Sequence, residues 1–419
     1  MSSSPAVLAL IGLLVTLVLS VTTRINVGLV AIGLAWLVGV YAAHLKADAV
    51  VNGFPSVLFI TLTGVTLLFA VAKANGTLAL LAARAPRLVR GRAGLLPILF
   101  FGLAFVLSAI GPGAIASVAL VAPLAMATGA RARIPNLLSA VMVGTGANAG
   151  NLSPISTVGA VVNAIMTRLG LAGNEWRIFA AMFAAHLAAA MGAYVLFGGW
   201  RLLRERSIVA VETSAAQSLT RAHWLTIGIT AMWIVAVVFF RVHVGLSAFA
   251  AATALILLRV SDERETVRGI PLDIILMVCG VSMMIAVLEA TGGLEMFTRL
   301  LAQLATPATV NGMIAFVTGL VSTYSSTVGV VLPTFLPMIP SLVRQVGGGD
   351  PVAVAISINV GSALVDVSPL STLGALCLAA VTERDQARLL FRQLLIWGLS
   401  MSVVGALLCL LLAPVFARL

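Results

Sequence analysis

The stretch Ser153-Pro154-Ile155-Ser156-Thr157-Val158-Gly159-Ala160 occurs a second time as Ser368-Pro369-Leu370-Ser371-Thr372-Leu373-Gly374-Ala375. Six of the eight residues are identical, and the two copies lie 215 positions apart. Each copy sits inside a long apolar run, where proline removes a helical hydrogen bond and glycine weakens the helix. A broken backbone at membrane depth persists only where protein buries it or where it lines a cavity. Two broken helices in corresponding places therefore predict the binding site of a transporter.

The composition is that of a polytopic membrane protein. Of the 419 residues, 61% are hydrophobic and only 9% are charged, which lies outside the range of soluble domains. The formal charge of +11 is spread over short loops between apolar runs. That distribution sets orientation in a membrane, and it argues against binding to nucleic acid. The three cysteines lie in apolar segments without metal-like spacing, so we expect no resident cofactor.

Further matches between the two halves indicate an internal duplication. Residues 64–71 align with residues 280–287 at an offset of 216, and residues 117–123 align with residues 327–333 at an offset of 210. Three collinear matches at nearly one offset predict two structural repeats. The predicted boundaries are 1–199 for the first repeat, 200–222 for a cytoplasmic linker and 223–419 for the second repeat.

The predicted fold is all-α, with five spans and one re-entrant hairpin in each repeat, and the broken helix is one of the five spans. The hairpins are expected at about 94–129 and 310–343, and the broken helices at about 135–169 and 351–381. For residues 94–129, two full spans joined by a short turn are the rival interpretation. Because five is an odd number, the second repeat would enter the membrane the opposite way up, which gives two inverted repeats.

The distribution of basic residues orients this arrangement. Placing the loops at 84–92, 131–133, 201–221, 259–268 and 384–392 inside, with Arg24, puts seventeen Lys and Arg residues on the cytoplasmic side and seven on the other. The positive-inside rule then predicts that both termini lie outside. We therefore expect a multi-pass protein of the cell inner (plasma) membrane, embedded in the lipid bilayer.

The breaks and the hairpin tips are the candidate sites for ligands. A half-helix N-terminus offers N–H groups to an anion, and a half-helix C-terminus offers carbonyl groups to a cation. The candidate substrate ligands are Gly113, Ala114, Asn151, Ser153, Pro154, Ser156, Thr157, Ser325, Ser326, Thr327, Ser368, Pro369, Ser371 and Thr372. The candidate cation ligands are Ser108, Asn148, Gly150, Thr323, Gly361, Ser362 and Asp366.

Asp366 is the one carboxylate embedded near a break. An acid at membrane depth is a functional candidate, and this one could bind Na⁺ or carry a proton. The alternative for the motif as a whole is that its small residues only let helices pack closely. Proline, asparagine and aspartate in the same stretch are not needed for packing, which favours the functional interpretation.

These motifs resemble those of the ion transporter superfamily of elevator-type carriers, which includes divalent anion/sodium symporters and malonate and C4-dicarboxylate carriers. Gly111-Pro112-Gly113 leading to Pro123, and Ser325-Ser326-Thr327 leading to Pro333, resemble the two hairpins of the dicarboxylate-carrier branch. The resemblance implies a homodimer with a scaffold domain and a moving transport domain. It also implies that each hairpin tip and its facing break hold a cation, with the substrate between them. The Ser-Asn-Thr hairpin signature of the symporters is absent here, which leaves the coupling ion open.

The sequence thus predicts a secondary transporter, not an enzyme, that carries a small organic dianion of the C4-dicarboxylate or malonate type. Na⁺ is the expected coupling ion, and H⁺ is the alternative. A second hypothesis is a cation/proton antiporter that uses Asp366 and binds no organic substrate. A channel and an intramembrane enzyme are the remaining alternatives, but the sequence shows no catalytic pair at matched depth.

Overall fold

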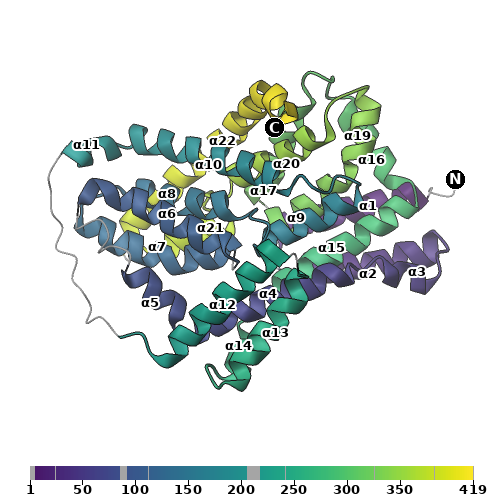
Figure 1. The fold of residues 1–419 in the computed structure, drawn as a ribbon. Coiled ribbons are helices and arrows are strands. Elements are labelled where there is room, and N and C mark those ends of the chain that lie inside the picture. The colour runs from purple at the N-terminus through teal and green to yellow at the C-terminus, as the bar shows by residue number, and fades with distance from the viewer. Residues whose placement is uncertain are drawn as a thin grey trace.

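The computed structural model describes residues 5–23, 25–84, 92–111, 113–204, 218–240, 242–324, 326–381 and 383–418. The regular elements among these residues are all helices (Figure 1). The first half contains α1 (Pro5–Thr22), α2 (Val27–Trp36), α3 (Ala47–Asn52), α4 (Ser56–Ala74), α5 (Thr77–Arg84), α6 (Leu96–Ala109), α7 (Gly113–Arg131), α8 (Asn136–Gly150), α9 (Thr157–Arg168), α10 (Glu175–Leu196) and α11 (Gly199–Arg204).

The second half follows the same order of elements. It contains α12 (Arg221–Phe240), α13 (Val244–Leu257), α14 (Glu263–Arg268), α15 (Leu272–Ala290), α16 (Gly293–Ala302), α17 (Val310–Tyr324), the π-helical turn η4 (Thr327–Val331), α18 (Leu332–Phe335), the 3₁₀ turn η5 (Leu336–Met338), α19 (Ile339–Val346), α20 (Pro351–Leu364), α21 (Thr372–Ala379) and α22 (Arg384–Arg418). Of the predicted linker, residues 205–217 lie outside the described residues, as do Pro112 and Ser325 of the predicted hairpin tips.

The helices pack into two bodies. The span body consists of α1–α5 with α12–α16, in which α2 and α4 both lie against α15, and α4 also lies against α13 (Figure 1). The hairpin body consists of α6–α10 with α17–α22, in which α8 packs on α6, α7 and α10, and α20 packs on α17 and α22. The bodies meet where α9 lies on α4, where η4 and α18 lie on α15, where α19 lies on α16 and, less extensively, where α7 lies on α5.

Two helix crossings in the span body depend on glycines. A Cβ on Gly28 would lie 2.2 Å from the Leu276 carbonyl oxygen, and one on Gly280 would lie 2.2 Å from the Gly28 carbonyl oxygen. In the other crossing, a Cβ on Gly64 would lie 2.3 Å from the Gly245 carbonyl oxygen. Such small residues let two backbones approach closely, which is a frequent device where membrane helices cross. The two crossings use residues that correspond in the two halves of the sequence at an offset of 216 or 217.

Several described helices are long and apolar enough to cross a membrane. Four pass that test by length and composition: Gly113–Arg131, Glu175–Leu196, Thr327–Val346 and Asp385–Leu412. A fifth results if the pair Ile275–Ala290 and Gly293–Ala302, bent by 91°, counts as one span. Over their full bounds, α1, α4, α12 and α15 also have 18 to 20 residues, whereas α2, α6, α13, α17 and α20 have 10 to 15. The helix α7 is long enough to cross a membrane by itself. The interpretation of residues 94–129 as two full spans, instead of a re-entrant hairpin, therefore stays open.

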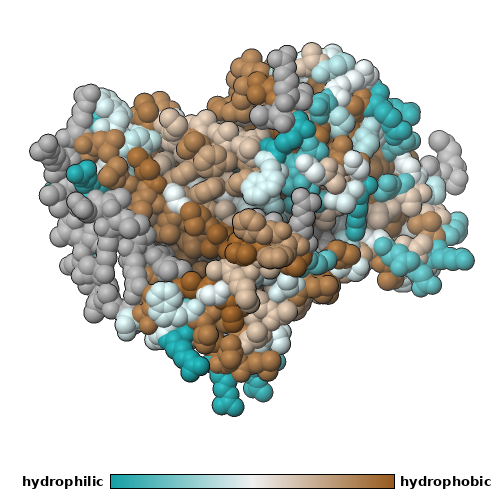
Figure 2. Space-filling model, viewed as in Figure 1, coloured by the Kyte–Doolittle hydropathy of each residue, from teal (hydrophilic) through white to brown (hydrophobic). Residues whose placement is uncertain are grey.

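The surface agrees with a membrane setting. In Figure 2, hydrophobic side chains cover much of the face in view, while hydrophilic side chains gather over the end that carries α3, α16 and α19. Large apolar side chains such as Phe239, Leu257 and Leu411 are each more than 70% exposed in the isolated chain. Apolar surface on this scale is the expected outcome when lipid, and not water, contacts a protein.

Candidate functional site

The first break separates α8 from α9, and its local structure follows from the sequence. Ser156 adopts an extended conformation (φ −80°, ψ 159°), and its hydroxyl accepts a hydrogen bond from the Gly159 N–H at 2.9 Å. The same oxygen lies 2.5 Å from the Asn151 carbonyl oxygen and 2.8 Å from that of Ser153. Ser156 is therefore the N-cap of α9, and it satisfies backbone groups that Pro154 and the break leave unpaired.

The second break, between α20 and α21, has the same construction. Ser371 is extended (φ −88°, ψ 163°), caps α21 and accepts from the Gly374 N–H at 3.4 Å. Its oxygen contacts the Asp366 carbonyl oxygen and lies 2.8 Å from that of Ser368. Each contact is the counterpart, 215 residues later, of a contact in the first break. Both serine hydroxyls are used within the protein, so they shape the breaks.

The two breaks lie against each other in the core of the hairpin body. The Asn148 side-chain amide donates a 2.9 Å hydrogen bond to the Ala363 carbonyl oxygen, at the ends of α8 and α20. A Cβ on Gly144 would lie 2.8 Å from a methyl group of Val367, which belongs to the second break. Asn148, Ser156 and Ser368 are completely buried. The structure thus brings together the two motifs that the sequence separates by 215 residues.

The turn between α6 and α7 reaches the first break. The Ala114 N–H donates to the Asn151 side-chain oxygen at 3.0 Å, and the Thr157 N–H donates to the Gly111 carbonyl oxygen at 3.2 Å. Gly113 has a φ of +77°, and a Cβ there would lie 2.7 Å from Thr157 Oγ1. Only glycine adopts this conformation so close to the break without strain. Gly113, Ala114, Asn151 and Thr157, four predicted site residues, therefore form one cluster.

Hydroxyl groups beside the turn between α17 and η4 form hydrogen bonds with the carboxylate of Asp366 in the second break. Thr327 Oγ1 donates to Asp366 Oδ1 at 2.5 Å, and Ser322 Oγ donates to the same oxygen at 3.3 Å. The hydroxyls of Ser322 and Thr327 also contact each other. Ser326 caps η4 by accepting from the Gly329 N–H at 3.0 Å. Half-buried Asp366 thus has two hydroxyl donors: Thr327, which the sequence analysis names as a candidate substrate ligand, and Ser322, which it does not name.

Other predicted ligands are placed differently. Thr323 and Ser362 donate to carbonyl groups one turn earlier in their own helices. Gly150 and Gly361 face the backbones of α6 and α17 at helix crossings, and Thr372 is exposed. Pro154 and Pro369 lie within the breaks, and Ser325 lies outside the described residues.

Two predicted cation ligands carry buried polar atoms that have no hydrogen-bond partner. Among the described residues, nothing donates to or accepts from Ser108 Oγ, and nothing donates to Asn148 Oδ1. Leaving a buried polar group unpaired costs free energy, so such atoms call for an explanation. Oxygen atoms of this kind are the ligands that hard cations prefer.

Comparisons with known proteins support a transporter. Residues 3–151 match the family described as the N-terminus of the dicarboxylate carrier protein MatC. This match covers about a third of the chain and ends at Asn151, in the first break. A search of curated proteins by sequence gave no match.

Solved structures share the fold over almost the whole chain. The YdaH transporter of Alcanivorax borkumensis is 15% identical, with a TM-score of 0.60 and coverage of 99% of both chains. MtrF of Neisseria gonorrhoeae, described among a class of antimetabolite efflux pumps, is 12% identical, with a TM-score of 0.55 and coverage of 97% of this chain and 95% of that one. The chain therefore has the fold of known membrane transporters.

Proposed function

We propose that the chain is a secondary transporter that carries a small organic dianion, of the C4-dicarboxylate or malonate type, across the cell inner membrane. One observation carries the proposal: the two capped helix breaks lie against each other, and each is contacted by a separate pair of helices joined by a turn. The α6–α7 turn contacts the first break and the α17–η4 turn contacts the second. Broken helices at one point in a membrane fold are the usual setting of transporter binding sites. The match of residues 3–151 to a dicarboxylate carrier supports the substrate class.

The chemistry of the site suits an anion that must also be released. Neither break contains lysine or arginine, and neither turn does. A carboxylate would be held by the N–H groups at the starts of α9 and α21, by hydroxyl groups and by a bound cation. Without a permanent guanidinium or ammonium partner, affinity depends on the coupling ion, which is the requirement for coupled transport.

Asp366 is the proposed point of ion coupling. Its carboxylate can bind Na⁺ together with neighbouring oxygens, or it can take up a proton. The buried oxygens of Ser108 and Asn148 are candidate ligands for a second cation near the first break. Both Na⁺ and H⁺ fit this set of groups, so the coupling ion is a matter for experiment.

The contact between the two bodies supports an elevator mechanism. α9 lies on α4, yet its counterpart α21 makes no comparable contact with α15 among the described residues. Likewise η4 and α18 lie on α15, whereas α7 makes no comparable contact with α4. With both termini outside, α9 and the η4–α18 arm belong to the outer half of the membrane. The arrangement would then be closed on the outer side and open toward the cytoplasm, as one end state of a sliding hairpin body.

A cation/proton antiporter remains the second candidate, because Asp366 would serve it equally well. Uptake of radiolabelled malonate, succinate and citrate into proteoliposomes, with and without an inward Na⁺ or pH gradient, separates the two functions. Saturable uptake that follows one gradient supports the dianion carrier. Ion exchange without uptake of any of the three anions would support the antiporter. Release from preloaded vesicles tests export, which is the direction described for MtrF.

A further inference from the structure

A polar pocket outside the two breaks lies between α16 and α19, next to a sharp bend of the span body. α15 and α16 meet at an angle of 91° at Gly292, whose φ is +77°. α16 buries one face through Leu294, Thr298 and Leu301, while Glu295 and Arg299 lie on its other face. If α15 crosses the membrane, α16 must run along its surface, which is how an amphipathic helix lies at an interface.

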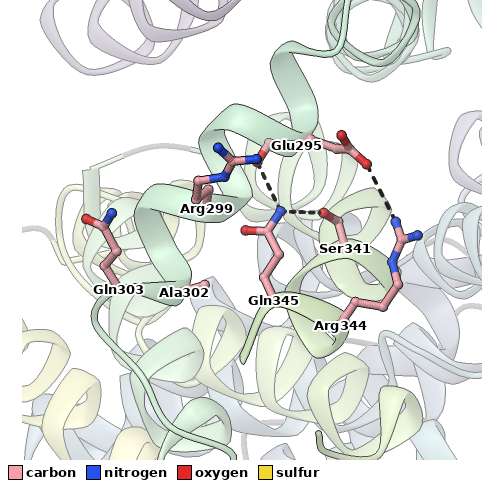
Figure 3. A pocket seen from close by; sticks show the side chains of 7 residues that line it. All are labelled: Glu295, Arg299, Ala302, Gln303, Ser341, Arg344 and Gln345. Atoms are coloured by element: carbon pink, nitrogen blue, oxygen red, sulfur yellow. Dashed lines mark hydrogen bonds and ion pairs between the residues drawn. The ribbon is translucent and has the colours of Figure 1, made fainter. Parts of the chain in front are cut away.

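The pocket between α16 and α19 has a volume of about 390 Å³ (Figure 3). Its lining residues are Glu295, Arg299, Ala302, Gln303, Ser341, Arg344 and Gln345. The Gln345 amide donates to the Glu295 carbonyl oxygen at 3.2 Å and to Ser341 Oγ at 3.1 Å, which ties the two helices together. Figure 3 shows Arg299 and Arg344 on either side of Gln345.

The charges of this pocket are incompletely balanced. Its lining contains two guanidinium groups and one carboxylate, so its net charge is positive. Arg344 lies 3.7 Å from Glu295, and both side chains are more than 60% exposed, so this ion pair is weak. Among the described residues, no ion pair or hydrogen bond to the Arg299 guanidinium is present. Arg299 therefore has its donors available to a ligand.

We propose that this pocket binds an oxyanion of the phosphate type between Arg299 and Arg344. Guanidinium groups present paired N–H donors that match the oxygens of a phosphate group. The position of α16 at the membrane surface is the level at which phospholipid phosphates lie, and basic pockets between helices are known to bind headgroups. The phosphate group comes from a phospholipid or from a free anion, and the two sources share the same chemistry.

A bound oxyanion would also affect transport, and this consequence rests on the proposed function. α16 belongs to the span body and α19 to the hairpin body, so a ligand that contacts both would strengthen their contact. It would favour the arrangement that is closed on the outer side and would slow the change to the other end state. The binding itself does not depend on transport, so the two proposals can fail separately.

The test measures binding to the full-length protein in nanodiscs. One arm compares phosphatidylcholine discs with and without phosphatidylglycerol and records bound lipid by native mass spectrometry. The other arm adds inorganic phosphate to phosphatidylcholine discs and records the thermal shift. The variant Arg299→Gln should lower the affinity for the bound probe about tenfold or more, because hydrogen bonds to charged groups are lost. Arg344→Gln should have a similar effect and serves as a second variant if Arg299→Gln folds poorly.

Arg388→Gln is the matched control, because Arg388 is an exposed arginine that lies 4.0 Å from Asp385, away from the pocket lining. Lipid retention that is lost in Arg299→Gln and kept in Arg388→Gln supports a phospholipid in the pocket. A phosphate-induced shift with the same dependence supports a free anion. Absence of binding of both probes, or binding that survives the loss of either pocket arginine, overturns the proposal.

Discussion

The two helix breaks have the same backbone construction but differ in one side chain that decides their chemistry. In each break a serine caps the second half-helix and contacts the same two carbonyl groups, those of residues 151 and 153 in the first and 366 and 368 in the second. At the position that meets the neighbouring turn, the first break has Asn151 and the second has Asp366. The Asn151 side-chain oxygen accepts a hydrogen bond from a backbone N–H, whereas the Asp366 carboxylate accepts hydrogen bonds from two hydroxyl groups.

Under the proposed function, this difference would give Asn151 a positioning role and Asp366 an ion-binding role. An amide keeps a neutral, fixed oxygen whatever ion is present, so Asn151 can hold the α6–α7 turn throughout a transport cycle. A carboxylate at membrane depth is unfavourable unless it is paired with a cation or protonated. The contact of the α17–η4 turn with Asp366 should therefore depend on the coupling ion. Under the proposed function, the matching backbones of the two breaks would supply the shape of the site, and Asp366 would supply its ion dependence.

The largest effect is expected from Asp366→Asn, which makes the second break like the first. Asn can still accept from Thr327 and Ser322, but it cannot carry a charge or balance Na⁺. Charge-assisted hydrogen bonds contribute about 1.5–3 kcal/mol, so gradient-driven uptake into proteoliposomes should fall at least about tenfold. Asp385→Asn is the control, because that side chain is 98% exposed at the start of α22. Undiminished gradient-driven uptake by Asp366→Asn would remove this residue from the coupling mechanism.

The next effect should be equal in the two breaks. A Cβ on Gly159 would lie 2.0 Å from the Ser153 carbonyl oxygen, and one on Gly374 would lie 2.0 Å from that of Ser368. Because these are backbone contacts, Gly159→Ala and Gly374→Ala should each lower the free energy of unfolding by about 1–3 kcal/mol. Thermal unfolding in detergent measures this loss. Tolerance of alanine at only one of the two positions would show that the breaks are not built alike.

The two turns should respond differently to a smaller change. Gly113→Ala places a side chain at a φ of +77° and brings its Cβ to 2.7 Å from Thr157 Oγ1, so a loss of about 1–2 kcal/mol is expected. Gly329→Ala meets only the flexible side chain of Met277, at 2.8 Å, and should cost less. The same unfolding assay compares them. A larger loss of unfolding free energy for Gly329→Ala than for Gly113→Ala would contradict the close packing of the α6–α7 turn against the first break.

The smallest effect is expected from the capping serines. Ser156→Ala and Ser371→Ala each remove an N-cap, which costs about 1 kcal/mol of stability. The matched geometry predicts similar losses in unfolding assays. Uptake should fall in both variants, because the N–H groups at the starts of α9 and α21 lose their orientation. If both variants transported at the wild-type rate, these helix starts would have no part in binding.

The fold elements with strong local signals were predictable from the sequence. The long apolar runs at 135–169 and 351–381 exceed one straight span, and each carries a serine-proline motif, so a break within them follows. The structure divides these runs between α8 and α9 and between α20 and α21. The helix α16, which forms after a bend at Gly292, is not among the elements that the sequence analysis predicts. Leu294, Thr298 and Leu301 recur at helical spacing, so α16 carries an amphipathic pattern, which a search for long apolar runs does not detect.

The candidate site was predictable in its motifs and not in its contacts. Asp366 and Thr327 stand out because polar groups are rare in apolar runs, but nothing local indicates that Ser322 shares Asp366 with Thr327. The hydrogen bond between Asn148 and Ala363 joins residues 215 positions apart, and its existence depends on how α8 packs near α20. The capping role of Ser156 and Ser371 also needed the backbone conformation of the breaks.

The central claim is that the two breaks and their turns together hold the transported dianion. A cryo-EM structure of the full-length protein, determined with a saturating dicarboxylate and Na⁺, tests it most directly. We predict density for the anion between the starts of α9 and α21, within hydrogen-bond distance of N–H groups there, and density for a cation beside Asp366. Anion density elsewhere, with both breaks unchanged and unoccupied, would contradict the account.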